Sequence, residues 1–276
     1  MSRASRLWKK VRQSSKHDGL CLYVYPFSIQ CIVVQFTVAL ALRGKFRASR
    51  DLANLKHRLV NLDRNENLQE WYLIEVNPLG KVPTLTGTAL PSPLTDCLSV
   101  VYWVCEQCPA LLPVSRRTEI VRLLTQLHEN FEGYSSPNPA VEDLLANHDI
   151  TPTHRQALEY KRECQRKQRE VVANNVSDGN SMTKETTAFL DEIVAQLAKH
   201  GNGTIWIYGD VGPTVLDTHV VAFIARLTDI SLEDLVPPEL RAYAATIMAL
   251  PEWQGVMKGR PTVWDPLQAP VEPLPN

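Results

Sequence analysis

Two short stretches of the sequence contain residues that could bind a peptide-like ligand. The first, residues 77–85, reads Asn-Pro-Leu-Gly-Lys-Val-Pro-Thr-Leu and places Pro83 after a β-branched residue, at the start of a short apolar run. Because proline has no backbone N–H, this order predicts a turn that enters a strand. We expect a cis Val82–Pro83 bond, which would leave the N–H and C=O of Val82 facing outward. A free backbone edge of this kind can pair with a ligand as an added strand does.

The second stretch, residues 93–103, contains an acidic residue in front of an apolar helical run. Asp96 is followed directly by Cys97 and the run itself. We therefore expect the Asp96 carboxylate near a helix N-terminus. Helix N-termini have unpaired N–H groups and the positive end of the helix dipole, and both attract anions.

A hydroxyl group follows the first expected strand. Residues 20–25 are a short β-rich run that Pro26 ends, and residues 32–42 are apolar nearly all round, which is typical of a helix buried between two layers. Ser28 lies where the N-cap or first-turn residue of that helix belongs. Strand, turn and buried helix are the opening of a βαβ unit.

Together these motifs resemble the glutathione-binding half of the glutathione S-transferases. The usual acidic–Ser pair of that family corresponds to Asp96-Cys97, and Cys97 departs from it by lacking a hydroxyl for the γ-glutamyl carboxylate. The resemblance implies that glutathione is the cosubstrate or cofactor. It implies backbone pairing at Val82, which precedes the cis Pro83, with Asp96 and Cys97 at the γ-glutamyl end and Lys81 at the glycine carboxylate.

The reaction of that family requires glutathione to be held as a thiolate. A free thiol with a pKa of about 8.5 is only a few per cent ionised at pH 7, and lowering that pKa by two units takes about 2.7 kcal/mol. One hydroxyl hydrogen bond to the sulfur supplies roughly 1.5–3 kcal/mol, and a helix N-terminus adds about 0.3–1 kcal/mol. Ser28 matches the activating serine of the Ser-type members. Tyr25 is the second candidate, because other classes use a tyrosine near the end of the same strand.

The resemblance also predicts where a second substrate binds. A bulky hydrophobic electrophile is expected between the domains, between the first helix and the first helix of the second domain. Ordinary packing is the alternative role for each residue of this expected pocket, which comprises Phe27, His128, Phe131 and Tyr134.

The sequence predicts no metal site. Cys105 and Cys108 have the spacing of a zinc knuckle, but no second pair of ligands follows, and the histidines are dispersed. Cys31 is three residues after Ser28, so a thioredoxin-type Cys-x-x-Cys pair has lost its first cysteine and dithiol exchange is excluded. We expect Cys31 to face the domain core.

The expected fold class is an α/β thioredoxin-like N-terminal domain plus an all-α C-terminal domain. We expect a basic disordered tail over residues 1–18, with an organelle presequence as the alternative. The thioredoxin-like domain is expected over 19–107, a linker over 108–114, the helical domain over 115–260 and a Pro-rich tail over 261–276. Within the first domain, residues 57–62 are expected to form the second strand, and a hairpin is expected from Val82 to Thr86 with its return at Leu90.

The helical half is predicted from apolar spacing and caps. Residues 116–131 have apolar positions at helical spacing, residues 133–138 are expected to form a loop, and residues 153–176 form a long charged helix that we expect to be largely solvated. Thr214 and Asp217 have capping-box spacing and resemble the Gly-Asp…Ser/Thr-x-x-Asp box of the transferase C-terminal domain.

Composition limits the remaining function classes. The chain has 276 residues, a net charge of −1 and six scattered cysteines. These values indicate a protein of about two domains with free thiols in a reducing compartment, and we expect it in the cytoplasm, with no nucleic-acid or membrane partner.

The resemblance implies a homodimeric glutathione transferase. Two alternatives stay open: a glutathione-dependent double-bond isomerase in a secondary-metabolite pathway of polyketide type, and a non-catalytic binding or regulatory module. The long inter-domain loops resemble those of a divergent fungal branch of the family associated with natural-product pathways.

Overall fold

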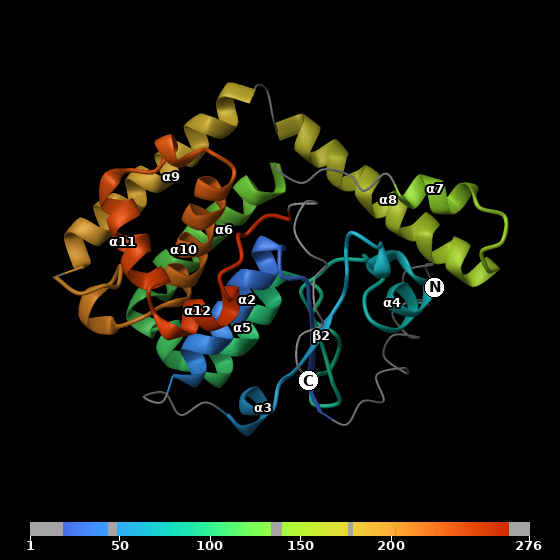
Figure 1. Ribbon diagram of the computed structural model, residues 1–276, viewed down its shortest axis with the longest axis horizontal. Coiled ribbons are helices and arrows are strands. Elements are labelled where there is room, and N and C mark those ends of the chain that lie inside the picture. Colours follow the sequence, from blue (N-terminus) through green and yellow to red (C-terminus); the bar gives the residue numbers. More distant parts are fainter. Residues whose placement is uncertain (1–18, 44–48, 134–139, 176–178, 202, 265–276) are drawn as a thin grey trace.

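The computed structural model describes residues 19–43, 49–133, 140–175, 179–201 and 203–264. A small mixed sheet and its helices form the first part of the chain, and helices alone form the second (Figure 1). This arrangement confirms the predicted fold class. The predictions for residues 1–18, for most of the loop at 133–138 and for most of the Pro-rich tail fall outside the described residues. No helix among the described residues combines the length and apolar character needed to cross a membrane.

The sheet has three strands in the order β2-β1-β3. The central strand β1 (Cys21–Val24) pairs in parallel with β2 (Lys56–Leu59) and antiparallel with β3 (Thr84–Thr86). Strand β2 is shorter than the expected 57–62, because the pairing in register with β1 ends at Leu59. A short helix α3 (Arg50–Ala53), which we did not expect, precedes β2.

The expected hairpin return at Leu90 is wrong. Strand β3 is instead bridged by Leu94, through hydrogen bonds in both directions between Leu85 and Leu94. Pro91 and Pro93 have no N–H to donate to a ladder, so the chain can pair with β3 only beyond them. The fourth strand of the expected order is therefore reduced to a single bridge, and α5 (Cys97–Gln107) begins three residues later.

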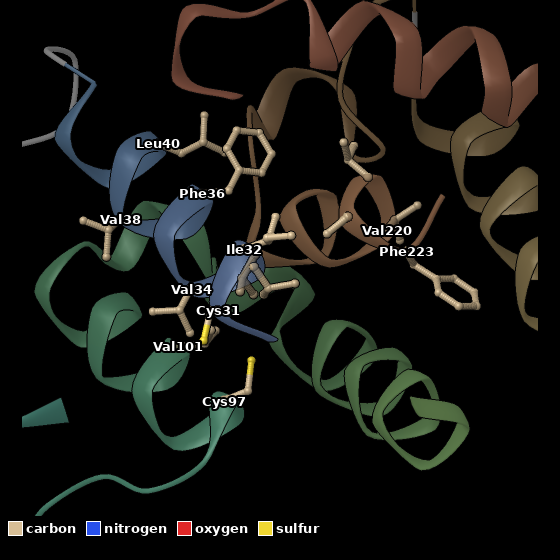
Figure 2. Close-up of a cluster of buried hydrophobic side chains, with 14 of the residues drawn as sticks. Cys31, Ile32, Val34, Phe36, Val38, Leu40, Cys97, Val101, Val220 and Phe223 are labelled. Atoms are coloured by element: carbon tan, nitrogen blue, oxygen red, sulfur yellow. The ribbon is translucent and has the colours of Figure 1, made fainter. Parts of the chain in front are cut away.

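Helix α2 (Ile29–Leu42) is the centre of the main core. It is apolar nearly all round, and it packs against α5 on one side and against α10 (Val215–Asp229) and α12 (Pro251–Met257) on the other. Figure 2 shows Val34 and Val38 directed toward α5, and Ile32 directed toward α10. Phe36 meets Trp253 of α12 edge to face, with ring centroids 5.2 Å apart. Helix α2 therefore joins the sheet to the helical domain.

The remaining helices belong to the second half of the chain, with the exception of α4 (Glu70–Glu75). They are α6 (Arg117–Gly133), α7 (Ala140–Ala146), α8 (Pro152–Asn175), α9 (Gly179–His200) and α11 (Pro238–Met248). Helix α7 was not expected from the sequence.

Helices α7 and α8 extend away from the helical bundle and lie over α4 of the first domain (Figure 1). A second, smaller core forms there, where Leu68 and Leu73 pack against Val141 and Leu158. His154 of α8 also lies 2.7 Å from the backbone oxygen of Leu68, measured from Nε2. The expectation that the charged helix is largely solvated is therefore wrong for the face of α8 that covers the first domain.

The capping box at the start of α10 is present as predicted. Asp217 is fully buried, and one of its carboxylate oxygens accepts hydrogen bonds from the N–H and the hydroxyl of Thr214, both at 2.7 Å. The other oxygen accepts from the N–H of Ile207 at 3.0 Å and from the hydroxyl of Tyr243 at 2.8 Å. Asp217 thus connects the loop before α10, the first turn of α10 and α11.

Replacing Asp217 should strongly destabilise the protein. Asp217→Ala leaves four buried donors without their acceptor, so we expect the free energy of unfolding to fall by about 3 kcal/mol or more. Urea denaturation followed by circular dichroism measures this change. The matched control is Asp191→Ala, at an exposed position of α9, which we expect to change stability by less than about 0.5 kcal/mol. If the two variants lowered the free energy of unfolding equally, the stabilising role assigned to the buried Asp217 would be wrong.

Candidate functional site

A cavity of about 600 Å³ lies between the two parts of the chain. From the first domain it is lined by the turn before α2 and by the segment before β3. From the helical domain it is lined by α8 and α10. The lining residues used below are Tyr25, Phe27, Ser28, Gln30, Leu62, Lys81, Val82, Lys161, Phe223 and Arg226. Its volume is within the range of small-molecule sites.

Ser28 is the N-cap of α2 and lines this cavity. Its Oγ accepts a hydrogen bond from the N–H of Cys31 at 3.4 Å. The Ser28 hydroxyl also interacts with the side chain of the buried Cys31, and rotation about its C–O bond can redirect its hydrogen to a ligand atom in the cavity. Because the side chain is half-buried at the start of a buried helix, the hydroxyl is held in place and is still accessible.

Tyr25 also lines the cavity, but its hydroxyl is engaged. It donates a hydrogen bond to the Asp63 carboxylate. Burial, and then this bond to Asp63, raise the pKa of the Tyr25 hydroxyl well above its usual value. A hydroxyl that already donates to a carboxylate has no second proton for a thiolate. This geometry favours Ser28 over Tyr25 as the donor.

The segment before β3 presents Val82 to the cavity. The Val82–Pro83 bond is cis, as predicted. Tyr72 and Asn77 hold the preceding residue, since the Tyr72 hydroxyl and Asn77 Nδ2 donate to the Lys81 carbonyl at 2.8 and 2.9 Å. The N–H and C=O of Val82 make no backbone hydrogen bond with the described residues. They remain available to a peptide-like ligand.

One end of the cavity is cationic. Lys161 of α8 is only 5 % exposed, and its Nζ donates to the Leu79 carbonyl at 2.7 Å and, more weakly, to the Gly80 carbonyl at 3.5 Å. Burial, together with the nearby charge of Lys81, lowers the pKa of Lys161 to about 8. The residues that line the cavity include Lys81, Lys161 and Arg226 but no carboxylate. A bound anion would therefore meet positively charged side chains in the wall of the cavity.

Lys161 was missed by the sequence analysis, although a signal existed. Ala157 and Leu158 are the buried positions of α8, and Lys161 follows them at the i+4 and i+3 spacings. Lys161 therefore belongs to the buried face of α8. The many charged residues of this helix had led us to expect that it is solvated.

Arg226, also missed, connects α10 to the start of α2. Its Nη2 donates to the Phe27 carbonyl at 2.8 Å and to the Thr262 carbonyl at 2.6 Å, and its Nε donates to the Thr262 hydroxyl at 3.1 Å. The Phe27 ring lies edge to face with Trp264, with centroids 5.1 Å apart. The segment after α12 therefore covers the turn that carries Ser28.

Asp96 and Cys97 lie at the start of α5 and are not among the residues that line the cavity. The exposed Asp96 is the N-cap, and it accepts from the N–H and hydroxyl of Ser99 at 2.8 and 2.6 Å. Cys97 is buried, and its Sγ lies 3.6 Å from the carbonyl oxygen of Gln30, a cavity residue. The Cys97 thiol thus faces the interior rather than the cavity.

The four residues expected around an electrophile do not gather in this cavity. Phe27 lines it. His128 instead packs against His219 of α10, with ring centroids 5.3 Å apart, because its position on α6 faces the bundle. The Phe131 side chain and Tyr134 lie outside the part of the chain that the structure describes. Helices α8 and α10, rather than α6, supply the second wall.

Neither the models of protein families nor the curated protein sequences give a match to this chain. Solved structures, in contrast, do match this chain. A glutathione transferase from Pseudomonas putida with glutathione disulfide bound has a TM-score of 0.57 at 14% identity, with 94% of this chain and 100% of the other covered. A delta-class glutathione transferase from Nilaparvata lugens has a TM-score of 0.54 at 15% identity, with 87% and 93% covered.

A maleyl pyruvate isomerase, a bacterial glutathione S-transferase in Zeta class, has a TM-score of 0.53 at 20% identity, with 90% of this chain and 100% of the other covered. Because all three identities are low, these likenesses concern the fold. From the sheet order, the position of the buried helix α2 and these neighbours, the chain has the glutathione transferase fold.

Proposed function

We propose that this protein binds glutathione in the inter-domain cavity and activates its thiol for attack on a bulky hydrophobic electrophile. The observation that carries the proposal is that Ser28, Val82 and Lys161 open on the same cavity. They supply a hydroxyl, a backbone edge without a backbone partner among the described residues, and a buried positive charge. Glutathione presents a thiol, a peptide backbone and terminal carboxylates, so each of these groups has a complementary partner on the ligand.

Two kinds of contact would orient the ligand. The cysteinyl backbone of glutathione pairs with Val82, and the glycine carboxylate is held by Lys81 and Lys161. At the other end, Asp96 receives the γ-glutamyl ammonium, as the family resemblance implies. Because the Cys97 thiol faces the interior, only the backbone N–H of Cys97 at the start of α5 is left for the γ-glutamyl carboxylate.

Ser28 would then lower the pKa of the bound thiol. Its hydroxyl donates to the sulfur, and this bond is stronger when the sulfur carries a charge. The thiol proton leaves to solvent, and the thiolate forms a bond to an electrophilic carbon of the second substrate. In a substitution a leaving group departs with its bonding electron pair, and in an addition the π bond opens and the adjacent atom takes a proton from solvent. The apolar side chains of Phe27, Leu62 and Phe223, which line the same cavity, favour a hydrophobic electrophile.

Replacing Ser28 tests this role directly. We expect Ser28→Ala to leave glutathione binding nearly intact and to raise the pKa of the bound thiol by about one to two units, since one hydrogen bond of roughly 1.5–3 kcal/mol is lost. Thiolate absorbance as a function of pH measures the shift. Turnover at pH 7 should fall about tenfold or more, and the loss should shrink toward pH 9.

Tyr25→Phe is the matched control, because it removes a hydroxyl that already donates to Asp63. We expect it to change the thiol pKa much less. If Tyr25→Phe raised the thiol pKa more than Ser28→Ala, Tyr25 would be the residue that activates the thiol. If neither variant alters the thiolate and no electrophile is consumed, the protein is a binding module. Conversion of a substrate with glutathione unconsumed would instead identify an isomerase.

The contact of Lys161 with a carboxylate predicts a pH dependence of binding. S-methylglutathione has no ionisable thiol, so ionisation of the sulfur does not affect its affinity. Its affinity should fall as pH rises through about 8, where Lys161 loses its proton. Lys161→Arg should remove this component, because arginine stays charged. Isothermal calorimetry from pH 6.5 to 9.5 measures both proteins, and identical pH profiles would refute the contact.

We also propose an isologous homodimer that uses the outer face of α5 and the start of α6. Tyr102 and Trp103 are partly exposed on α5, and Val114, just before α6, is 87% exposed. An apolar surface of this kind is typical of a subunit interface. Light scattering should give twice the chain mass of 31.1 kDa at micromolar concentration. Val114→Asp should shift the protein toward monomer, whereas the control Val211→Asp, at another exposed valine, should not.

A further inference from the structure

We propose that Cys97, His128 and His219 bind a zinc ion that ties the first domain to the helical domain. The three residues come from α5, α6 and α10 and are far apart in the sequence. One ligand atom from each lies within 4.8 Å of the others. The distances between ligand atoms in a tetrahedral site are shorter than this limit, and small side-chain movements would close the set around an ion. The inference is independent of the proposed glutathione chemistry.

His219 provides the observation that points to a ligand. It is fully buried, and its Nδ1 lies 2.8 Å from the Val215 carbonyl oxygen. Because a carbonyl only accepts, Nδ1 carries the proton and Nε2 has the lone pair. That Nε2 has no hydrogen-bond partner among the described residues. Histidines that bind metals commonly donate their other ring N–H to a backbone carbonyl in this way.

The protonation states fit the same conclusion. Zinc binds the neutral imidazole, and the hydrogen bond between Nδ1 of His219 and the Val215 carbonyl leaves the lone pair of Nε2 for the ion. Burial raises the pKa of the Cys97 thiol. Without a cation the thiol keeps its proton. On binding of zinc the sulfur would coordinate as a thiolate, and its proton would be released to solvent.

One sulfur and two imidazole nitrogens favour zinc over magnesium or calcium, which prefer oxygen ligands. Three protein ligands leave a fourth position for water, which can approach from the side of the half-buried His128. Cys31 also lies beside Cys97, directed toward it from α2 (Figure 2). It is not one of the three residues whose ligand atoms are gathered.

The test uses the full chain with any affinity tag removed. Zinc content is measured by elemental analysis, and the ion is then exchanged for Co²⁺, which reports on thiolate ligands through its ultraviolet charge-transfer band. We expect one metal ion per chain and a thiolate–cobalt band. Cys97→Ser should abolish the band, and His219→Gln should weaken zinc binding at least about tenfold. Cys105→Ser, at another buried cysteine of α5, is the matched control and should retain the thiolate–cobalt band.

The unaltered protein keeps the proposal falsifiable even if a variant fails to fold. Absence of zinc above the buffer level, together with no cobalt–thiolate band, would show that the three residues only pack together. A band that survives in Cys97→Ser and disappears in Cys105→Ser would place the metal at Cys105 and Cys108 and would overturn the assignment. Removal of zinc by a chelator should lower the melting temperature of the unaltered protein but not that of Cys97→Ser.

Discussion

Helix α2 is apolar nearly all round, and this property forces the two domains to close around it. A helix with so few polar residues must be covered over most of its surface, and the sheet can cover only one side. Helices α5, α10 and α12 cover the rest. The fully buried pair Thr37 and Thr218, whose hydroxyl oxygens are 2.9 Å apart, shows how closely α2 and α10 approach. Ser28 at the start of α2 is consequently fixed at the seam between the domains, where the cavity lies.

The cationic end of the cavity depends on a different contact, that of α8 with the first domain. A lysine whose pKa falls from 10.5 to about 8 carries a burial cost of roughly 3 kcal/mol when it is charged. The carbonyls of Leu79 and Gly80 offset only part of this cost, since they bring dipoles and not a countercharge. A buried cation without a carboxylate among the lining residues of its cavity is typical of a site whose ligand supplies the anion.

The elements that could be predicted from the sequence are those set by local rules. The N-cap at Ser28, the cis bond before Pro83 and the capping box at Thr214 each depend on a few neighbouring residues, and all three are present in the structure. The bridge to Leu94 was missed because a strand needs both a register and free donors, and the prolines around residue 92 remove the donors. Lys161 was missed because overall charge hid the buried face of α8.

The sequence could not predict which residues that are far apart along the chain lie side by side in the fold. No spacing rule connects Cys97, His128 and His219, since only the packing of α5 and α10 around α2 and α6 brings them together. For the same reason the sequence analysis expected His128 in the electrophile pocket, whereas in the structure it packs against His219. A helix predicted from its own periodicity has no defined rotation until its neighbours are known. The second wall of the cavity thus required the structure.

The hydrogen bonds of Lys161 separate its structural role from its proposed binding role. A charged lysine has three N–H donors, and the carbonyls of Leu79 and Gly80 accept from it at 2.7 and 3.5 Å. The third donor is left for a ligand. A neutral amine keeps two donors, which is enough for both carbonyls. Loss of the proton near pH 8 would therefore remove both the charge and the donor that face the ligand, while α8 stays attached to the turn before β3. Arginine at this position would keep the charge at any pH, so the pH dependence, more than the affinity itself, distinguishes a ligand contact from a contact that only supports the fold.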